Sequence, residues 1–231
     1  MASRNETVLV CAAHPDDEVL GCGGAIARHA ARGDAVHILI LSQGLFSRDG
    51  QADSEALESL RGAARRSAAV LGAAGITFGD FPDNRMDEVA RLDVTKLIEE
   101  SIGRLAPSIV YTHHPVDLNV DHVRVHECVS VACRPLPGSS VRDLRFFEVA
   151  SSSEWRPPGN GSAFQANLFV DIGVFLEKKL EALRAYGSEM RPWPHARSLE
   201  AVEHLARWRG ASAGLEAAEA FVIGRQIVEG T

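Results

Sequence analysis

This sequence of 231 residues lacks long apolar runs and a surplus of basic charge. No apolar run approaches the roughly 20 residues needed to span a bilayer, so we expect no membrane span. Lys and Arg number 24 against 31 Asp and Glu, and the net charge of −7 argues against a nucleic-acid partner. The start, MASRNETVLV, has no basic segment followed by an apolar one. We therefore expect no signal peptide and a cytoplasmic location.

Cysteine pairs are also lacking: the four cysteines show no CxxC spacing (Cys11, Cys22, Cys128, Cys133). This pattern is typical of reduced, buried thiols and argues against a cysteine-rich zinc site. Apolar residues make up 45% of the chain, which is near the globular average and argues against disorder. The chain is long enough to bury a sizeable core.

Apolar strands and helices alternate along the first 135 residues. Segment 7–13 is β-branched and apolar without alternation, which is typical of a parallel strand covered on both faces. Further strands are expected at 35–42, 75–80 and 108–114, and helices at 22–32, 53–72, 92–105 and 121–134. This alternation predicts an α/β fold with a mostly parallel sheet.

After residue 135 the rhythm changes and turn-rich segments appear. Strands are expected at 144–150 and 166–173, and helices at 175–187, 198–209 and 213–228. We interpret the Pro/Gly-rich stretch 156–162 as a surface loop, not a domain linker. We predict one domain over residues 1–231, with an α/β core over 1–135 and an extension over 136–231 that completes the fold.

Two polar clusters follow strands of the predicted sheet. His-Pro-Asp-Asp-Glu (14–18) ends the first strand, and a His/Asp-rich stretch (113–122) follows the strand that ends near Thr112. Ligands of open parallel sheets bind beyond the carboxyl ends of the strands, so both clusters should converge on one edge. Each cluster also has a simpler explanation. The acids of the first cluster could lie in the first turn of a helix, where they favour the helix dipole, and the histidine of the second could lie on a helix face. Their coincidence at strand ends favours a metal site.

The residue types in the clusters suit zinc. Zinc binds imidazole and carboxylate groups, and a catalytic zinc keeps three protein ligands and an open position. His14 and Asp17 lie three residues apart across a strand-to-helix turn, and His122 opens a later helix. Asp16 would stay unligated near the open position, where a carboxylate can take a proton from water. We predict one zinc per chain, with other divalent metals as alternatives.

The glycines of GCGG (21–24) suggest a different function. A strand, a glycine cluster and a helix together are the context of a dinucleotide-binding turn. The spacing is not GxGxxG, however, and the second strand ends in Ser42-Gln43-Gly44 and not in an acid. A nucleotide-binding oxidoreductase is therefore the alternative hypothesis.

Three stretches resemble the LmbE/PIG-L family: AHPDDEVLGCGG, HHPVDLNVDH and LGAAGITFGDFPDNRMD. The resemblance covers most of residues 7–150. It implies a Rossmann-like three-layer fold, with helices on both faces, and a zinc-dependent hydrolase that removes acetyl groups from N-acetylglucosamine-type amino sugars. Matched residue by residue, it implies three zinc ligands, His14, Asp17 and His122. It also implies Asp16 as the general base and Asp121 as a carboxylate that orients its neighbours.

One position departs from the family pattern. Many members have His-x-Asp-His where this chain has Asn119-Val120-Asp121-His122. Asparagine cannot release a proton, but its amide can donate a hydrogen bond to an oxyanion. We interpret Asn119 as that donor and leave the general acid open between Asp16, His113 and His114. The departure also allows a member that has lost catalysis and acts as a binding protein.

The substrate is expected to be a small N-acetylated amino sugar or its conjugate, such as a polysaccharide precursor, a nucleotide sugar or a secondary metabolite. Arg61 and Arg85 are candidates to hold a substrate phosphate or hydroxyl, because arginine forks suit phosphate. A solvated helix face is the alternative for Arg61. His113 is a further substrate-binding candidate, and a homo-oligomer is left open.

Overall fold

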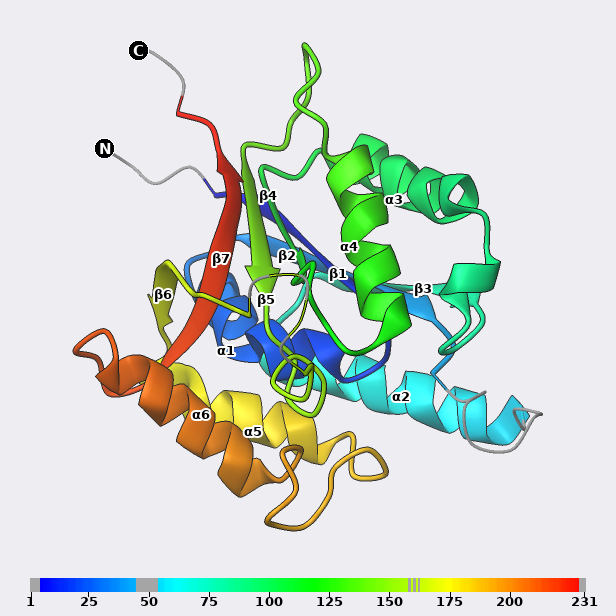
Figure 1. Ribbon diagram of the computed structural model, residues 1–231. Coiled ribbons are helices and arrows are strands. Elements are labelled where there is room, and N and C mark those ends of the chain that lie inside the picture. Colours follow the sequence, from blue (N-terminus) through cyan, green and yellow to red (C-terminus); the bar gives the residue numbers. More distant parts are fainter. Residues whose placement is uncertain (1–4, 45–53, 158, 160, 162, 229–231) are drawn as a thin grey trace.

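The computed structural model describes residues 5–44, 54–157, 159, 161 and 163–228 (Figure 1). These residues form a seven-stranded sheet in the order β3-β2-β1-β4-β5-β7-β6. The strands are β1 (Thr7–Ala12), β2 (Ala35–Ser42), β3 (Gly75–Phe81), β4 (Ile109–His113), β5 (Asp143–Phe147), β6 (Leu168–Asp171) and β7 (Ala218–Gln226). The helices are α1 (Asp17–Ala31), α2 (Ser54–Leu71), α3 (Arg91–Leu105), α4 (Val120–Ala132), α5 (Leu176–Arg184) and α6 (Leu199–Ala211). Two short 3₁₀ helices are η1 (Met86–Glu88) and η2 (Gly173–Phe175).

Strands β1 to β5 pair in parallel, and β7 pairs antiparallel with both β5 and β6. Parallel strands need crossover connections, which α1 to α4 supply. The predicted α/β class with a mostly parallel sheet is confirmed. None of the described helices is long and apolar enough to cross a membrane.

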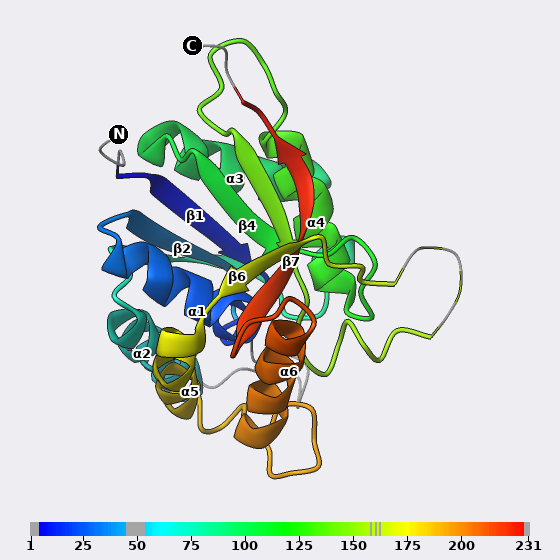
Figure 2. The same ribbon diagram turned by 90° about the vertical axis from the view of Figure 1, so that its left-hand side faces the viewer.

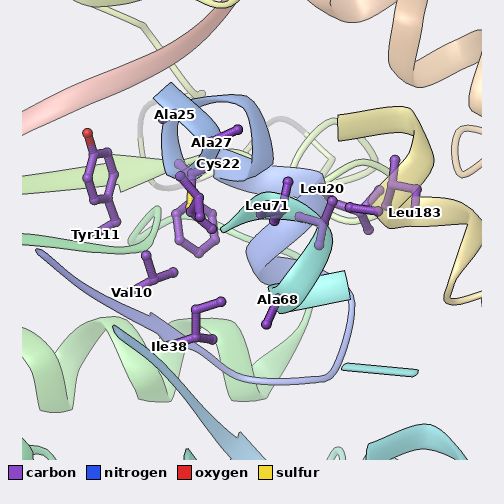
Figure 3. Close-up of a cluster of buried hydrophobic side chains, with 14 of the residues drawn as sticks. Val10, Leu20, Cys22, Ala25, Ala27, Ile38, Ala68, Leu71, Tyr111 and Leu183 are labelled. Atoms are coloured by element: carbon purple, nitrogen blue, oxygen red, sulfur yellow. The ribbon is translucent and has the colours of Figure 1, made fainter. Parts of the chain in front are cut away.

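Helices cover both faces of the sheet, as expected for three layers. Helices α1, α2, α5 and α6 lie on one face, and α3 and α4 lie on the other (Figures 1 and 2). Each face has its own apolar cluster. Figure 3 shows part of the first, where Val10 and Ile38 of the sheet face Leu20 of α1 and Leu71 of α2. The sheet is therefore buried between two apolar layers.

The prediction of a helix at 213–228 was wrong, because this segment contains strand β7. Its Ala and Glu residues have high helix propensity, but tertiary context overrides such local preferences. Here β7 fills the gap between β5 and β6, where ladder hydrogen bonds form on both sides. Phe221 is fully buried and pairs with Phe147 across the ladder.

The GCGG glycines lie inside α1, which begins at Asp17 and not at residue 22 as predicted. The helix is kinked at Cys22. The amides of Gly24 and Ala25, which the kink frees, donate to the two carboxylate oxygens of Glu219 at 2.8 and 2.7 Å. Glu219 also pairs with the buried Lys179 at 2.6 Å. The amides of Gly24 and Ala25 are thus satisfied by a protein carboxylate.

Packing explains the first glycine of this cluster. A methyl group at Gly21 would overlap the ring of Phe147. Gly21→Ala should therefore destabilise the protein by about 1–3 kcal/mol, the usual cost of overpacking a core. Gly103→Ala is the matched control, because Gly103 lies in α3 and has nothing within 4 Å of an added Cβ. That variant should gain roughly 0.5–1 kcal/mol from helix propensity. Urea unfolding measures the free energy of unfolding of both variants. Equal stability of the two would contradict this packing argument.

Candidate metal centre and active site

The two polar clusters meet at one edge of the sheet. Strands β1 and β4 are parallel neighbours, so their carboxyl ends lie side by side. His14 follows β1 and Asp17 is the first residue of α1. His122 lies in the first turn of α4, which follows β4. The structure therefore brings together the three residues that the sequence predicts as metal ligands.

Three donor atoms of these residues form a nearly equilateral triangle. His14 Nδ1 lies 3.1 Å from Asp17 Oδ2, and His122 Nε2 lies 3.2 Å from the same oxygen. The two ring nitrogens are 3.3 Å apart. Tetrahedral zinc with bonds of about 2.0–2.1 Å places its ligand atoms about 3.3–3.4 Å apart. The donor set and its spacing fit a divalent ion such as zinc, and Asp17 Oδ1 is buried without a partner among the described residues.

Outer carboxylates fix which ring nitrogen faces the triangle. His14 Nε2 lies 3.0 Å from Asp121 Oδ2 and 3.2 Å from Asp83 Oδ1. His122 Nδ1 lies 3.1 Å from Asp117 Oδ1. These carboxylates favour a proton on the outer nitrogen of each ring, which would leave the lone pair of the inner nitrogen for a metal. Such carboxylate–histidine pairs orient metal ligands and raise their basicity.

The charge around the two histidines is strongly negative. Burial lowers the pKa of His14, but hydrogen bonds to Asp121 and Asp17 raise it to about 10. Burial likewise lowers the pKa of His122, yet the charge of Asp17 and the hydrogen bond to Asp117 raise it to about 9. Both rings therefore tend to hold an extra proton in this field. A cluster that attracts protons in this way also attracts a divalent cation.

A second group of donors, His14, Asp83 and Asp121, is also close enough to hold an ion. Asp121 is engaged by the backbone, however: its Oδ2 accepts the amide of Asn84 at 2.6 Å and its Oδ1 accepts that of Met86 at 2.9 Å. Asp121 Oδ2 thus lies within hydrogen-bond distance of His14 Nε2 while both of its oxygens accept backbone amides.

Asp16 lines a polar cavity of about 150 Å³, which His14 of the triangle also lines. Its Oδ2 accepts a hydrogen bond from Arg197 Nη1 at 2.9 Å, whereas its Oδ1 is buried without a partner among the described residues. Burial raises the pKa of Asp16 to about 7, against the opposing charge of Arg197. The cavity lining is almost entirely polar: His14, Pro15, Asp16, Gly44, Asp83, Asn84, Asn119, Glu189 and Arg197. An unligated carboxylate oxygen beside a metal site suits a proton acceptor.

Asn119 is the N-cap of α4 and lines the same cavity. Its Oδ1 accepts the amide of Asp121 at 2.8 Å, and its Nδ2 donates to Asn84 Oδ1 at 2.8 Å. One hydrogen of the side-chain amide is thus used within the protein, and the second remains for another acceptor.

None of the three predicted substrate-binding residues lines this cavity. Arg61 Nη2 pairs with Asp80 at 2.5 Å, and Arg85 Nη2 pairs with Glu88 at 2.5 Å. Arg61 and Arg85 are therefore each engaged in an ordinary ion pair. His113 is fully buried, and its Nε2 accepts the amide of Ala13 at 2.8 Å.

His113 instead packs against His122. Its ring stacks on the ring of His122 with centroids 4.0 Å apart, and burial lowers its pKa well below the usual range. The ring is fully buried and presents no surface to the cavity. His114 Nδ1 lies 3.1 Å from the carbonyl oxygen of Val116, and His114 does not line the cavity either.

Several residues of this site were not predicted from the sequence. Asp83, Asn84, Glu189 and Arg197 line the cavity, although none stands in the two polar clusters (14–18 and 113–122) and only Asp83 and Asn84 stand in one of the three stretches that resemble the family. Asp117, which stands in the second motif, orients His122 and is itself held by the hydroxyl groups of Ser152 and Ser153. A polar residue directly after β3, such as Asp83, was the available signal, because this strand ends at the same edge. Glu189 and Arg197 come from a stretch without periodicity; Arg197 resembles a family position, but the sequence assigned it no role.

Comparison with known proteins places the chain in a family. The PIG-L family model, described as GlcNAc-PI de-N-acetylase, matches residues 9–133. The uncharacterized deacetylase YaiS of Escherichia coli K12 is 32% identical over 141 residues, which cover 59% of this chain and 72% of YaiS. Diacetylchitobiose deacetylase of Thermococcus kodakarensis is 30% identical over 190 residues, covering 79% of this chain and 69% of that enzyme.

Two further likenesses extend over most of the chain. A 4-oxalmesaconate hydratase of Pseudomonas putida is 27% identical over 216 residues, covering 84% of this chain and 78% of that enzyme. The crystal structure of the conserved protein TT1542 from Thermus thermophilus superposes with a TM-score of 0.75 at 25% identity and covers 97% of both chains. The matching model spans more than half of the sequence, and the chain belongs to the PIG-L family.

Proposed function

We propose that the protein is a zinc-dependent deacetylase that removes the acetyl group from an N-acetylated amino sugar or its glycoconjugate. The observation that carries this proposal is the donor triangle beside the unpartnered oxygen of Asp16. Relatives that are named as deacetylases support the reaction class. We further propose that residues 1–231 act as one domain, since strands from both parts share one sheet.

His14, Asp17 and His122 would hold the zinc ion. When bound, such an ion polarises an amide carbonyl and lowers the pKa of a water molecule at its open position. Asp121 and Asp117 keep the two imidazole rings in the orientation that ligation requires. The role of the three proposed ligands, held by these carboxylates, is therefore to bring the acetamide group of the substrate next to Asp16.

Asp16 is the proposed general base. Its free Oδ1 takes the proton from the attacking water, while Arg197 continues to hold Oδ2. His113 and His114 do not line the cavity, so we assign to the protonated Asp16 the transfer of that proton to the leaving amine. The products are acetate and a free amino sugar. Positioned proton transfer of this kind contributes about 100- to 10,000-fold to the rate.

A substrate panel tests the reaction. Purified protein, loaded with zinc, is incubated with N-acetylglucosamine, N,N′-diacetylchitobiose, a nucleotide-linked N-acetyl sugar and N-acetylated glycoside metabolites. Acetate and primary amine are measured together, and the proposal expects them in equal amounts from at least one substrate. Bound zinc without acetate release from any substrate would instead indicate a binding protein that has lost catalysis.

A hydratase is the second candidate, because one relative that matches most of the chain is named as a hydratase. Such a reaction adds water to its substrate and releases no acetate. Incubation with unsaturated oxo-tricarboxylic acids of the 4-oxalmesaconate type, followed by loss of their ultraviolet absorbance, distinguishes the two reactions. A nucleotide-binding oxidoreductase has no comparable support, since Glu219 already occupies the Gly24 and Ala25 amides.

Asn119 has a specific expected effect. Asn119→Ser retains a residue that can cap α4 but removes the amide donor, so stability should change little. Loss of a well-aimed oxyanion donor costs about 2.7–4 kcal/mol, so turnover should fall about 100- to 1,000-fold. Steady-state acetate release and urea unfolding of the same preparation check both effects. Unchanged turnover would mean that the free amide hydrogen of Asn119 does not reach the oxyanion.

A further inference from the structure

The backbone of Asp16 is held in an uncommon conformation. Its φ of 105° and ψ of −28° lie in the left-handed half of the Ramachandran plot, which residues other than glycine seldom adopt. Such a conformation costs about 1–3 kcal/mol and persists only when the surroundings enforce it. The contacts that enforce it therefore bear on where the carboxylate of Asp16 lies.

One contact acts on the backbone of Asp16. Glu18 Oε2 accepts the amide of Asp16 at 3.1 Å, and Glu18 Oε1 accepts the hydroxyl of Tyr186 at 2.5 Å. Glu18 and Tyr186 are both fully buried. Tyr186, which follows α5, thus reaches the base through one intervening carboxylate.

A second contact acts on the side chain. Arg197 Nη1 donates to Asp16 Oδ2 at 2.9 Å, and Arg197 Nε donates to Ser151 Oγ at 2.7 Å. The guanidinium group is therefore fixed between the base and the loop after β5. Since only Oδ2 is engaged, Oδ1 is the oxygen left to accept a proton.

We propose that Arg197 is a positioning residue, which holds Oδ2 of Asp16 so that Oδ1 stays free for the proton of water. The inference rests on the proposed function, because it assigns a role within the same reaction. Tyr186 and Glu18 act in the same direction by holding the Asp16 amide. The segment from α5 to α6 thus completes a site whose proposed ligands lie between residues 14 and 122.

A direct substrate contact is the competing explanation, because Arg197 also lines the cavity. The two explanations differ in their kinetic signature. Loss of a positioning contact lowers kcat and leaves KM nearly unchanged, whereas loss of uniform substrate binding raises KM.

The test compares Arg197→Met and Arg197→Lys with Arg209→Met. Arg209 is a matched control, since its side chain is 22% exposed against 23% for Arg197 and it pairs with Glu148 at 2.7 Å outside the cavity. Arg197→Met should lower kcat about 100-fold, the scale of a misplaced catalytic group, with KM within about threefold and zinc content unchanged. Arg197→Lys should recover part of that loss, because a cation again faces Oδ2. Arg209→Met should keep the parent kcat.

A second pair of variants covers the possibility that Arg197→Met fails to fold. Tyr186→Phe should lower kcat with full zinc content, whereas Tyr111→Phe should not, although both tyrosines are buried. The hydroxyl of Tyr111 instead faces His29 and Arg145, which lie outside the cavity around Asp16.

Several results would overturn the proposal. A raised KM with normal kcat in Arg197→Met would make Arg197 a substrate-binding residue. Equal losses in the methionine and lysine variants, with normal turnover in Tyr186→Phe, would remove the positioning role. If the parent releases no acetate from any substrate, the proposed function fails. Crystal structures of the parent and of Arg197→Met then test the positioning role of Arg197 independently of activity. The Asp16 carboxylate should be displaced in Arg197→Met, and an unchanged Asp16 would contradict the positioning role.

Discussion

Replacing His14 by alanine should remove both the zinc and the acetate-releasing activity of the protein. The change deletes one corner of the donor triangle and leaves only Asp17 and His122, whereas stable sites for this ion use at least three protein ligands. Metal content by mass spectrometry and acetate release should therefore both fall to background. This is the largest effect that we expect from a single substitution in this chain.

His204→Ala is the control for this experiment, because His204 is an exposed histidine of α6. It should retain both zinc and activity. Circular dichroism checks that His14→Ala still folds, since the ring also bonds to Asp121. Full zinc occupancy in a folded His14→Ala protein would show that the ion binds elsewhere.

Asp16→Asn should separate metal binding from catalysis. Asparagine has the same shape and its oxygen can still accept from Arg197, so the site should keep its zinc. It cannot take a proton from water, so turnover should fall about 100- to 10,000-fold. Zinc content and kcat are measured on the same preparation.

Asp143→Asn is the matched control for the base. Asp143 is also a buried aspartate, but it pairs with Arg145 at the start of β5 and does not line the cavity around Asp16. Its variant should keep the parent kcat even if its stability falls. A near-normal turnover in Asp16→Asn would remove Asp16 from the mechanism.

Strands β1 and β2 were predictable because they carry an unambiguous apolar pattern. The predicted segments 7–13 and 35–42 match β1 and β2 within one residue at each end. Both strands are buried on two faces, so their sequences are apolar without alternation. The convergence of His14 with His122 followed from the same observation, since adjacent parallel strands end at one edge.

The parts that were missed depend on contacts distant in sequence. Strand β7 begins with Ala218 and Glu219, which favour a helix locally, and only its partners β5 and β6 make it a strand. Arg197 enters the site through Ser151 and Asp16, which are separated from it by more than 40 residues of chain. No periodicity marks such a residue. Arg61 of α2 and Arg85 after β3 were chosen by residue type, and residue type does not show that each side chain pairs with a carboxylate, Asp80 or Glu88.

The most direct measurement is a zinc titration of metal-stripped protein with acetate release as the readout. The proposed site contains one donor triangle per chain, formed by His14, Asp17 and His122. Acetate release should therefore be absent without metal, rise linearly with added zinc and level off at about one equivalent per chain. Full activity in the metal-stripped protein, or a rise that is retained in His14→Ala, would contradict a zinc-dependent deacetylase built on this triangle.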